Sequence, residues 1–197
     1  MMSLINALPG AVAQGLIWGI MAIGVYLTFR ILDIADLTVD GSLGTGGAVC
    51  IMLMLSGQNV WVAMAGATAA GMAAGLATGI LHTFMGIPAI LAGILTQLGL
   101  YSINLKTMGK ANQAINVDKY DLLVSLRFIR KVPFYKNTIL IVAIAIILLI
   151  VVLYWFFGTE LGCSLRATGC NDKMARAQGI NTDFNRVLGL MISNGLV

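Results

Sequence analysis

Long apolar segments separated by short polar breaks dominate the sequence. An uncharged run from Ala11 to Phe29 covers nineteen residues. As a helix it would measure about 28 Å, which is enough to reach across most of a membrane core. A second uncharged run, 138–157, is dense in Ile, Leu and Val and ends in the aromatic residues typical of a membrane interface. Both runs predict membrane-spanning helices.

The stretch 41–105 carries no formal charge when His82 is neutral. Turn signals at 56–59 and 85–88 divide it into three apolar pieces, 42–55, 60–82 and 88–105. The first piece is short and rich in glycine, so it is either a full crossing or half of a broken helix. The pattern therefore predicts an all-α fold, a polytopic transmembrane helical bundle with about five to six spans.

Small residues in the second piece recur at a spacing that favours helix packing. Gly71, Gly75 and Gly79 are four residues apart and would line one face of a helix. Small residues on a membrane helix let a neighbouring backbone approach closely. We therefore expect these three glycines to face another helix and not lipid.

Composition agrees with a membrane protein. Of the 197 residues 59% are hydrophobic, 10% are charged, and the mean hydropathy is +0.93. The net charge of +4 does not indicate nucleic-acid binding, because the basic residues lie between apolar runs and no basic patch is interleaved with aromatic residues. We expect a multi-pass protein of the cell (plasma or inner) membrane, in contact with lipid.

The segment 158–185 is a charged island between two apolar runs. Asn171 and Asp172 sit where the start of a short helix would need an acceptor, and Ser164 or Thr168 would also serve as a cap. Gly179 marks the end of that helix. A surface helix bracketed by membrane spans is a natural docking element.

The island resembles the cytoplasmic coupling segment of permease subunits of ABC importers, in the family that serves branched-chain amino acids and simple sugars. The family pattern, roughly L-R-A-x-G-x-N-x-x-A-A-x-x-x-G-I-N, is matched by Leu165, Arg166, Ala167, Gly169, Asn171, Ala175, Gly179, Ile180 and Asn181. Met174 replaces the first of the paired alanines. Within the family the chain looks most like the branch that works with binding proteins of the tryptophan/tyrosine type.

The resemblance implies a function and partners. It predicts one transmembrane permease domain over 1–197, a pore subunit of an ATP-driven importer of small polar solutes, first of all amino acids. The expected partners are an ABC ATPase, an extracytoplasmic substrate-binding protein, and a second permease copy or related chain. The predicted ATPase-coupling residues are Arg166, Ala167, Thr168, Gly169, Asn171, Asp172, Ala175, Arg176, Gly179, Ile180 and Asn181. Of these, Gly169 and Gly179 would form the flanking turns, and Ala175 would enter a groove of the ATPase.

The sequence offers no motor or catalytic centre of its own. The loop pattern Gly-x-x-x-x-Gly-Lys-Ser/Thr does not occur, so ATP would be bound by another chain. The three cysteines show no Cys-x-x-Cys spacing, and the single histidine has no metal-ligand partners in the sequence. We therefore expect neither an enzyme, nor a metal, nor a cofactor in this chain.

A polar break follows the first span. Asp33, Asp36 and Asp40 lie between two apolar segments, where an acid is costly and often functional. The break resembles the Asp-Leu-Ser-x-Gly-Ser element of sugar-type permeases, with one extra residue before Gly41 and Ser42. The predicted translocation path comprises Asp36, Thr38, Asp40, Ser42 and Thr45.

Three other interpretations of the break stay open. The acids can lie at the membrane surface, with Asp40 or Ser42 capping the next helix. Alternatively, Asp36 or Asp40 can serve a secondary transporter as a proton or cation site. Closely spaced aspartates also occur in Mg²⁺-dependent membrane phosphotransferases, but no basic residue follows Asp40 before Lys106 to hold a phosphate.

Orientation brings two tendencies into conflict. The resemblance places 158–185 in the cytoplasm, so the loop 106–137 would lie outside although it holds seven of the twelve basic residues. That opposes the positive-inside tendency, and we follow the resemblance. Five earlier crossings place the N-terminus outside; if 42–55 does not cross, the N-terminus is inside. The apolar run 187–197 is too short to span a membrane, so we expect a longer protein that continues beyond it.

Overall fold

The computed structural model describes residues 2–110, 113 and 138–197. Its helices are α1 (Met2–Tyr26), the π-helix η1 (Leu27–Ile31), α2 (Val39–Leu55), α3 (Val60–Thr83), α4 (Ala89–Met108), α5 (Thr138–Gly158), α6 (Glu160–Cys170), α7 (Asp172–Ala177) and α8 (Thr182–Leu196). The described residues contain no strand. The predicted all-α polytopic class is confirmed.

Four helical stretches are long and apolar enough to cross a membrane: Leu8–Ile31, Val60–Thr83, Ala89–Met108 and Ile139–Gly158. They agree with the predicted spans to within a few residues. The first stretch is longer than predicted, because α1 continues into the π-helical turn of η1, where Leu32 N–H donates to Leu27 C=O at 3.1 Å. The basic loop falls outside the described residues except for 106–110 and 113.

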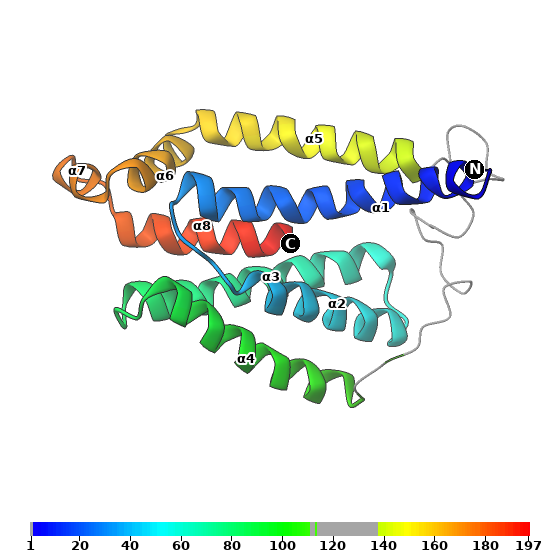
Figure 1. Cartoon of the computed structure of the whole chain (residues 1–197). Helices are drawn as coiled ribbons and strands as arrows, with labels where there is room; N and C mark the ends of the chain where they lie inside the picture. Colours follow the sequence, from blue (N-terminus) through cyan, green and yellow to red (C-terminus); the bar gives the residue numbers. More distant parts are fainter. Residues whose placement is uncertain (1, 111–112, 114–137) are drawn as a thin grey trace.

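The apolar piece 42–55 forms α2, which is shorter than the four candidate spans and follows an irregular segment. The chain leaves η1 at Asp33, which has a positive φ of 56°, and runs without regular structure to the start of α2. In Figure 1 this connection re-enters the bundle, and α2 begins near the middle of the molecule. A helix of 17 residues is about 26 Å long, so the extended residues before α2 supply the rest of the passage.

The path of the chain separates the two ends of the bundle. In Figure 1 the N-terminus lies at one end, and α6 and α7 lie at the opposite end, beyond the ends of α1 and α5. The segment 32–55 returns the chain from the end of α1 to the end where α3 begins, so five passages precede α6. Five passages place the N-terminus at the end opposite α6 and α7, and the side of the membrane that it faces stays a prediction.

Helix α8 occupies the centre of the described structure. It packs against α3 and α1, while α2 packs against α3 and α4, and α5 packs against α1 (Figure 1). Leu190 is fully buried, whereas the outer helix α5 exposes about half of its apolar side chains. Helix α8 thus provides much of the internal packing of the described residues.

Candidate functional site

The charged island folds as two short helices and not as one. Thr159 caps α6, since its Oγ1 accepts the N–H of Gly162 at 3.4 Å, and Asn171 caps α7 by accepting the N–H of Met174 at 3.1 Å. The prediction of a cap at Ser164 or Thr168 is wrong, because both hydroxyls lie inside α6. They donate there to the carbonyls of Leu161 and Ser164.

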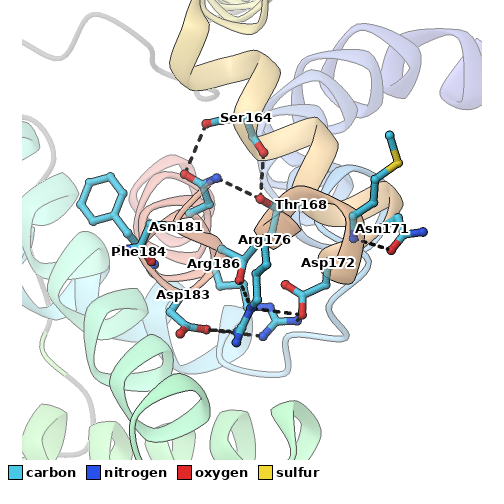
Figure 2. Close-up of polar contacts among 12 residues, drawn as sticks. Ser164, Thr168, Asn171, Asp172, Arg176, Asn181, Asp183, Phe184 and Arg186 are labelled. Atoms are coloured by element: carbon cyan, nitrogen blue, oxygen red, sulfur yellow. Dashed lines mark hydrogen bonds and ion pairs between the residues drawn. The ribbon is translucent and has the colours of Figure 1, made fainter. Parts of the chain in front are cut away.

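Four charged side chains join α7 to the start of α8 in a closed ring. Arg176 contacts Asp183 at 2.7 Å and Asp172 at 3.6 Å, and Arg186 contacts the same two carboxylates at 3.8 and 3.3 Å (Figure 2). The Nε of Arg176 also donates to the buried Thr182 hydroxyl at 2.6 Å. Single exposed ion pairs contribute about 0–1 kcal/mol, but a network shares the cost of ordering the side chains. We refer to Asp172, Arg176, Asp183 and Arg186 as the charge ring.

A second set of contacts fixes α6 on α8. Asn185 is 3% exposed, and its Nδ2 donates to the Thr168 hydroxyl at 2.9 Å. Its Oδ1 accepts from the Ser164 hydroxyl at 3.3 Å. Both ends of the Asn185 amide are therefore used, as a buried amide requires. The two sets together hold α6 and α7 in one position relative to α8.

The predicted coupling residues divide into an outer and an inner group. Arg166, Asn171, Arg176, Gly179 and Asn181 are exposed, whereas Thr168 and Ala175 are buried at 4% and 2% exposure. Ala167, Gly169, Asp172 and Ile180 are partly exposed.

Two of the predicted roles need correction. Ala175 packs within the chain, so the expectation that it enters a partner's groove is wrong, and the exposed Met174 beside it replaces it as a candidate. Gly179 does form a turn, with a φ of 83°. Gly169 lies inside α6, not in a turn, and a side chain there would strike the backbone of Ile31.

The polar break contains a buried network of hydrogen bonds. The two oxygens of the Asp36 carboxylate have different partners: Oδ1 accepts the N–H of Thr38 at 2.8 Å, and Oδ2 accepts the Nδ2 of Asn194 at 2.7 Å. The Thr38 and Thr78 hydroxyls lie 2.7 Å apart and are both almost fully buried. Asp36 thus joins the start of α2 to the end of α8.

The remaining residues of the predicted path lie along α2 with different exposures. Asp40 is exposed, whereas Ser42 and Thr45 are 1% and 7% exposed. No side chain caps α2: the residue before the helix, Thr38, makes no capping hydrogen bond, and the Ser42 hydroxyl donates to Val39 C=O at 3.0 Å. Asp36 accepts the N–H of Thr38, which lies before the helix begins. The interpretation in which Asp40 or Ser42 caps this helix is therefore wrong.

The three glycines of α3 face α8. A methyl group on Gly75 would lie 2.9 Å from the Cα of Met191, and one on Gly79 would lie 3.0 Å from the Cα of Val187. On Gly71 it would lie 3.2 Å from the carbonyl carbon of Asn194. The glycines therefore allow two helix backbones to approach closely.

A cavity of about 480 Å³ opens at the end of the bundle where α6 and α7 lie. Its walls come from the connection after η1, the turn between α3 and α4, and the junction of α6 with α7. His82 lines it and has its Nδ1 2.8 Å from Ile87 C=O, which fastens the turn. Among the described residues, no group of three His, Cys, Asp or Glu side chains is placed to hold a metal ion.

Sequence reasoning missed four residues that the structure places in these networks: Thr78, Asn185, Arg186 and Asn194. A usable signal existed for Asn194. It is a polar amide in an apolar run, and polar groups in such helices usually have a partner inside the bundle. Its particular partner, Asp36, is 158 residues away in the sequence and could not be inferred from spacing.

These features define a multi-pass helical membrane protein with an irregular segment before α2 and an end-on helical hairpin. Residues 8–196 match one family model, the permease component of the branched-chain amino acid transport system. The chain belongs to this family of ABC importer permeases, which are multi-pass inner-membrane proteins and not enzymes.

Several curated proteins are similar along most of the chain. The tyrosine transport system permease protein of Clostridioides difficile is 36% identical over 98% of this chain and 62% of its own length. The uncharacterized protein RP368 of Rickettsia prowazekii is 35% identical over 97% and 65%. The autoinducer 2 import system permease protein LsrC of Yersinia pestis is 32% identical over 90% and 48%. The chain thus spans less than two thirds of these relatives, and no solved structure matches it.

Proposed function

We propose that this chain forms part of the solute pathway of an ATP-driven importer, and that α6 and α7 are the dock for a separate ATPase subunit. The observation that carries the proposal is the α6–α7 hairpin itself. It lies beyond the ends of the long apolar helices (Figure 1), and its inner side is held by the charge ring (Figure 2) and by Asn185. A rigid, exposed element at the end of a bundle can transmit force from a partner.

The cargo is a small polar solute, with amino acids as the first choice. The relative from Clostridioides difficile is named for tyrosine transport, which supports an amino acid. The LsrC relatives are named for import of autoinducer 2, so membership of the family alone does not select the cargo. An extracytoplasmic binding protein would deliver the solute, and a second permease copy or related chain would complete the pathway.

The mechanism is a shift of populations. ATP binding would close the ATPase pair. The closed pair would contact the α6–α7 hairpin more favourably in one of the two pore states, and this difference in binding free energy would shift the population towards that state. The chain itself makes and breaks no bond. On the pore side, α2 is the candidate lining, because it starts inside the bundle after an irregular segment, and irregular backbone at membrane depth must border protein or water.

Met174 provides the test of docking. It is 58% exposed on α7. Met174→Glu should abolish co-purification of the ATPase subunit in mild detergent, because the interface would then have to bury an unpaired charge. Met85 is a matched control: it is 65% exposed in the turn between α3 and α4, at the same end of the bundle (Figure 1). An unchanged yield of complex with Met174→Glu would refute the dock.

The pore side has its own matched pair. A side chain at Gly47 would meet nothing within 4 Å, whereas Thr45 is 7% exposed and its hydroxyl donates to Gly41 C=O at 2.8 Å. In a cysteine-free background, Gly47→Cys should react with a small polar thiol reagent much faster than Thr45→Cys. Equal protection of both cysteines in every nucleotide state would remove α2 from the pathway.

A further inference from the structure

Helix α8 connects the charge ring to the irregular segment before α2. At its first turn, Thr182, Asp183 and Arg186 contact α7, as described above. At its last turn, Asn194 contacts Asp36. The two sets of contacts are eight residues apart between Arg186 and Asn194, about 12 Å along a helix.

The contact at the far end is buried and specific. Asn194 is 1% exposed, and its Nδ2 donates both to Asp36 Oδ2 at 2.7 Å and to Leu190 C=O at 3.0 Å. Its Oδ1 is buried and has no hydrogen-bond partner among the described residues. A buried amide whose oxygen accepts no hydrogen bond lowers the stability of the fold. The hydrogen bond from its Nδ2 to Asp36 offsets part of that cost.

Asp36 passes this contact directly to α2. Its second oxygen holds the N–H of Thr38, the residue before α2 begins, and Thr38 is also fixed by the Thr78 hydroxyl. A movement of Asn194 along the axis of α8 therefore acts on the start of α2 through one side chain. No chain connection exists between α8 and α2 to do this, since they are separated by α3 to α7.

Helix α8 is closely packed against two neighbours. Gly71 and Gly75 let the backbone of α8 lie close against α3, and the Ser193 hydroxyl donates to Gly24 C=O of α1 at 2.6 Å. Closely packed interiors transmit strain. We therefore expect a shift of the N-terminal half of α8 to reach its last turn.

We infer that Asn194 is the positioning residue that couples the α6–α7 hairpin to α2, with Asp36 as its receiver. This inference rests on the proposed function, because a displacement of the hairpin reaches α2 during transport only if an ATPase moves the hairpin. The physical link between the charge ring and α2 does not depend on the partner. It is therefore tested in the chain alone, reconstituted in lipid nanodiscs.

The variants follow from the hydrogen-bonding capacity of each side chain. Asn194→Asp removes the amide donor and sets two carboxyl groups 2.7 Å apart. Such a pair can hold one shared proton, so thiol labelling is carried out at alkaline pH, where both groups are ionised and the link is broken. The swap, Asp36→Asn together with Asn194→Asp, restores one amide donor and one carboxylate acceptor. In the swap, Asn at 36 still accepts the Thr38 N–H through its Oδ1. If the residue at 194 served only to stabilise the fold, restoring the response would not require an amide donor and a carboxylate acceptor at positions 36 and 194.

The readout is the rate at which a polar thiol reagent labels Gly47→Cys on α2. Arg186→Glu perturbs the charge ring, and in the parent chain it should change this rate by about 2- to 30-fold, the range expected for coupling through contacting networks. In the Asn194→Asp background, Arg186→Glu should change the rate less than twofold, and in the swap the response should return. Lys173→Glu, at an exposed residue that has no ion pair among the described residues, is the control for charge alone.

The outcomes separate the two proposals. A full response to Arg186→Glu in the Asn194→Asp background, or no response in the parent chain, overturns the inference about Asn194. Repeating the labelling with the ATPase and ATP present tests the proposed function. If no ATPase binds the chain, that result counts against α6 and α7 as the dock. The labelling of the chain alone still decides the role of Asn194.

Discussion

Gly75→Ala is the most direct test of the packing between α3 and α8. The added methyl group would lie 2.9 Å from the Cα of Met191 and closer still to the carbonyl of Leu190. These are backbone atoms that cannot rotate away, so the two helices must separate. We therefore expect the chain to lose stability, although alanine is a better helix former than glycine.

The size of the loss follows from two opposing effects. Overpacking a close contact costs about 1–3 kcal/mol, and replacing glycine by alanine in a helix returns about 0.5–1 kcal/mol. The clash at Gly75 is with backbone atoms, so the upper part of the overpacking range applies, about 2–3 kcal/mol, and the net loss is about 1–2.5 kcal/mol. At about 2–4 °C per kcal/mol for a chain of this size, the unfolding midpoint should fall by about 2–10 °C.

The measurement is thermal unfolding in a mild detergent, followed by intrinsic tryptophan fluorescence. Gly99→Ala on α4 is the matched control, because a methyl group there meets nothing within 4 Å. It should leave the midpoint unchanged or raise it slightly through helix propensity alone. If Gly75→Ala also leaves the midpoint unchanged, α3 and α8 do not pack as closely as the structure shows.

Three further predictions concern other contacts. Thr38→Val leaves the buried Thr78 hydroxyl without this partner and should cost about 1–3 kcal/mol by the same unfolding assay, whereas adding Thr78→Val should recover part of the loss. Arg176→Ala removes two contacts of the charge ring and should speed limited proteolysis of α7 severalfold, with Lys173→Ala as the control that does not. A cysteine at Lys110 should react with an impermeant reagent in intact cells, and a cysteine at Lys173 only after the membrane is opened; the reverse order would invert the topology.

Hydrophobic patterning predicted most of the helices because length and apolarity are local properties. The runs 11–29, 60–82, 88–105 and 138–157 correspond to the four long apolar stretches. The irregular segment before α2 was also foreseeable, since a glycine-rich piece too short for a span follows a polar break. In each case the information lay within about twenty consecutive residues.

The contacts of the site were not foreseeable in the same way. The Asp36–Asn194 and Thr38–Thr78 hydrogen bonds join residues 158 and 40 positions apart, and only the folded chain determines which polar groups meet. The burial of Ala175 was misjudged for a related reason. A family pattern marks a residue as needed but does not say whether it faces a partner or its own chain.

The helix caps show where local reasoning fails even at short range. Thr159, Ser164 and Thr168 all have side chains able to cap a helix, and sequence alone does not rank them. The choice depends on where α5 stops. Gly158 ends that helix, and Thr159 then takes an extended ψ of 165°, which turns its hydroxyl towards the next helix. Once Thr159 caps α6, the other two hydroxyls are inside it and bond to carbonyls of the preceding turn.

The distribution of charge in the fold bears on the conflict between the resemblance and the positive-inside tendency. Arg30 lies in η1, at the same end of the bundle as α6 and α7, so that end holds five basic residues: Arg30, Arg166, Lys173, Arg176 and Arg186. The loop at the other end holds seven. Arg176 and Arg186 are also paired with carboxylates in the charge ring, so the net positive charge of the hairpin end is smaller than its count of basic residues. The positive-inside tendency counts Lys and Arg in short loops near the ends of spans. The loop 106–137 has only two more of these residues than the end with α6 and α7, so the tendency favours a cytoplasmic loop by a small margin. A difference of that size is a weak constraint on the orientation, and the proposed docking of an ATPase at the hairpin requires the cytoplasmic side.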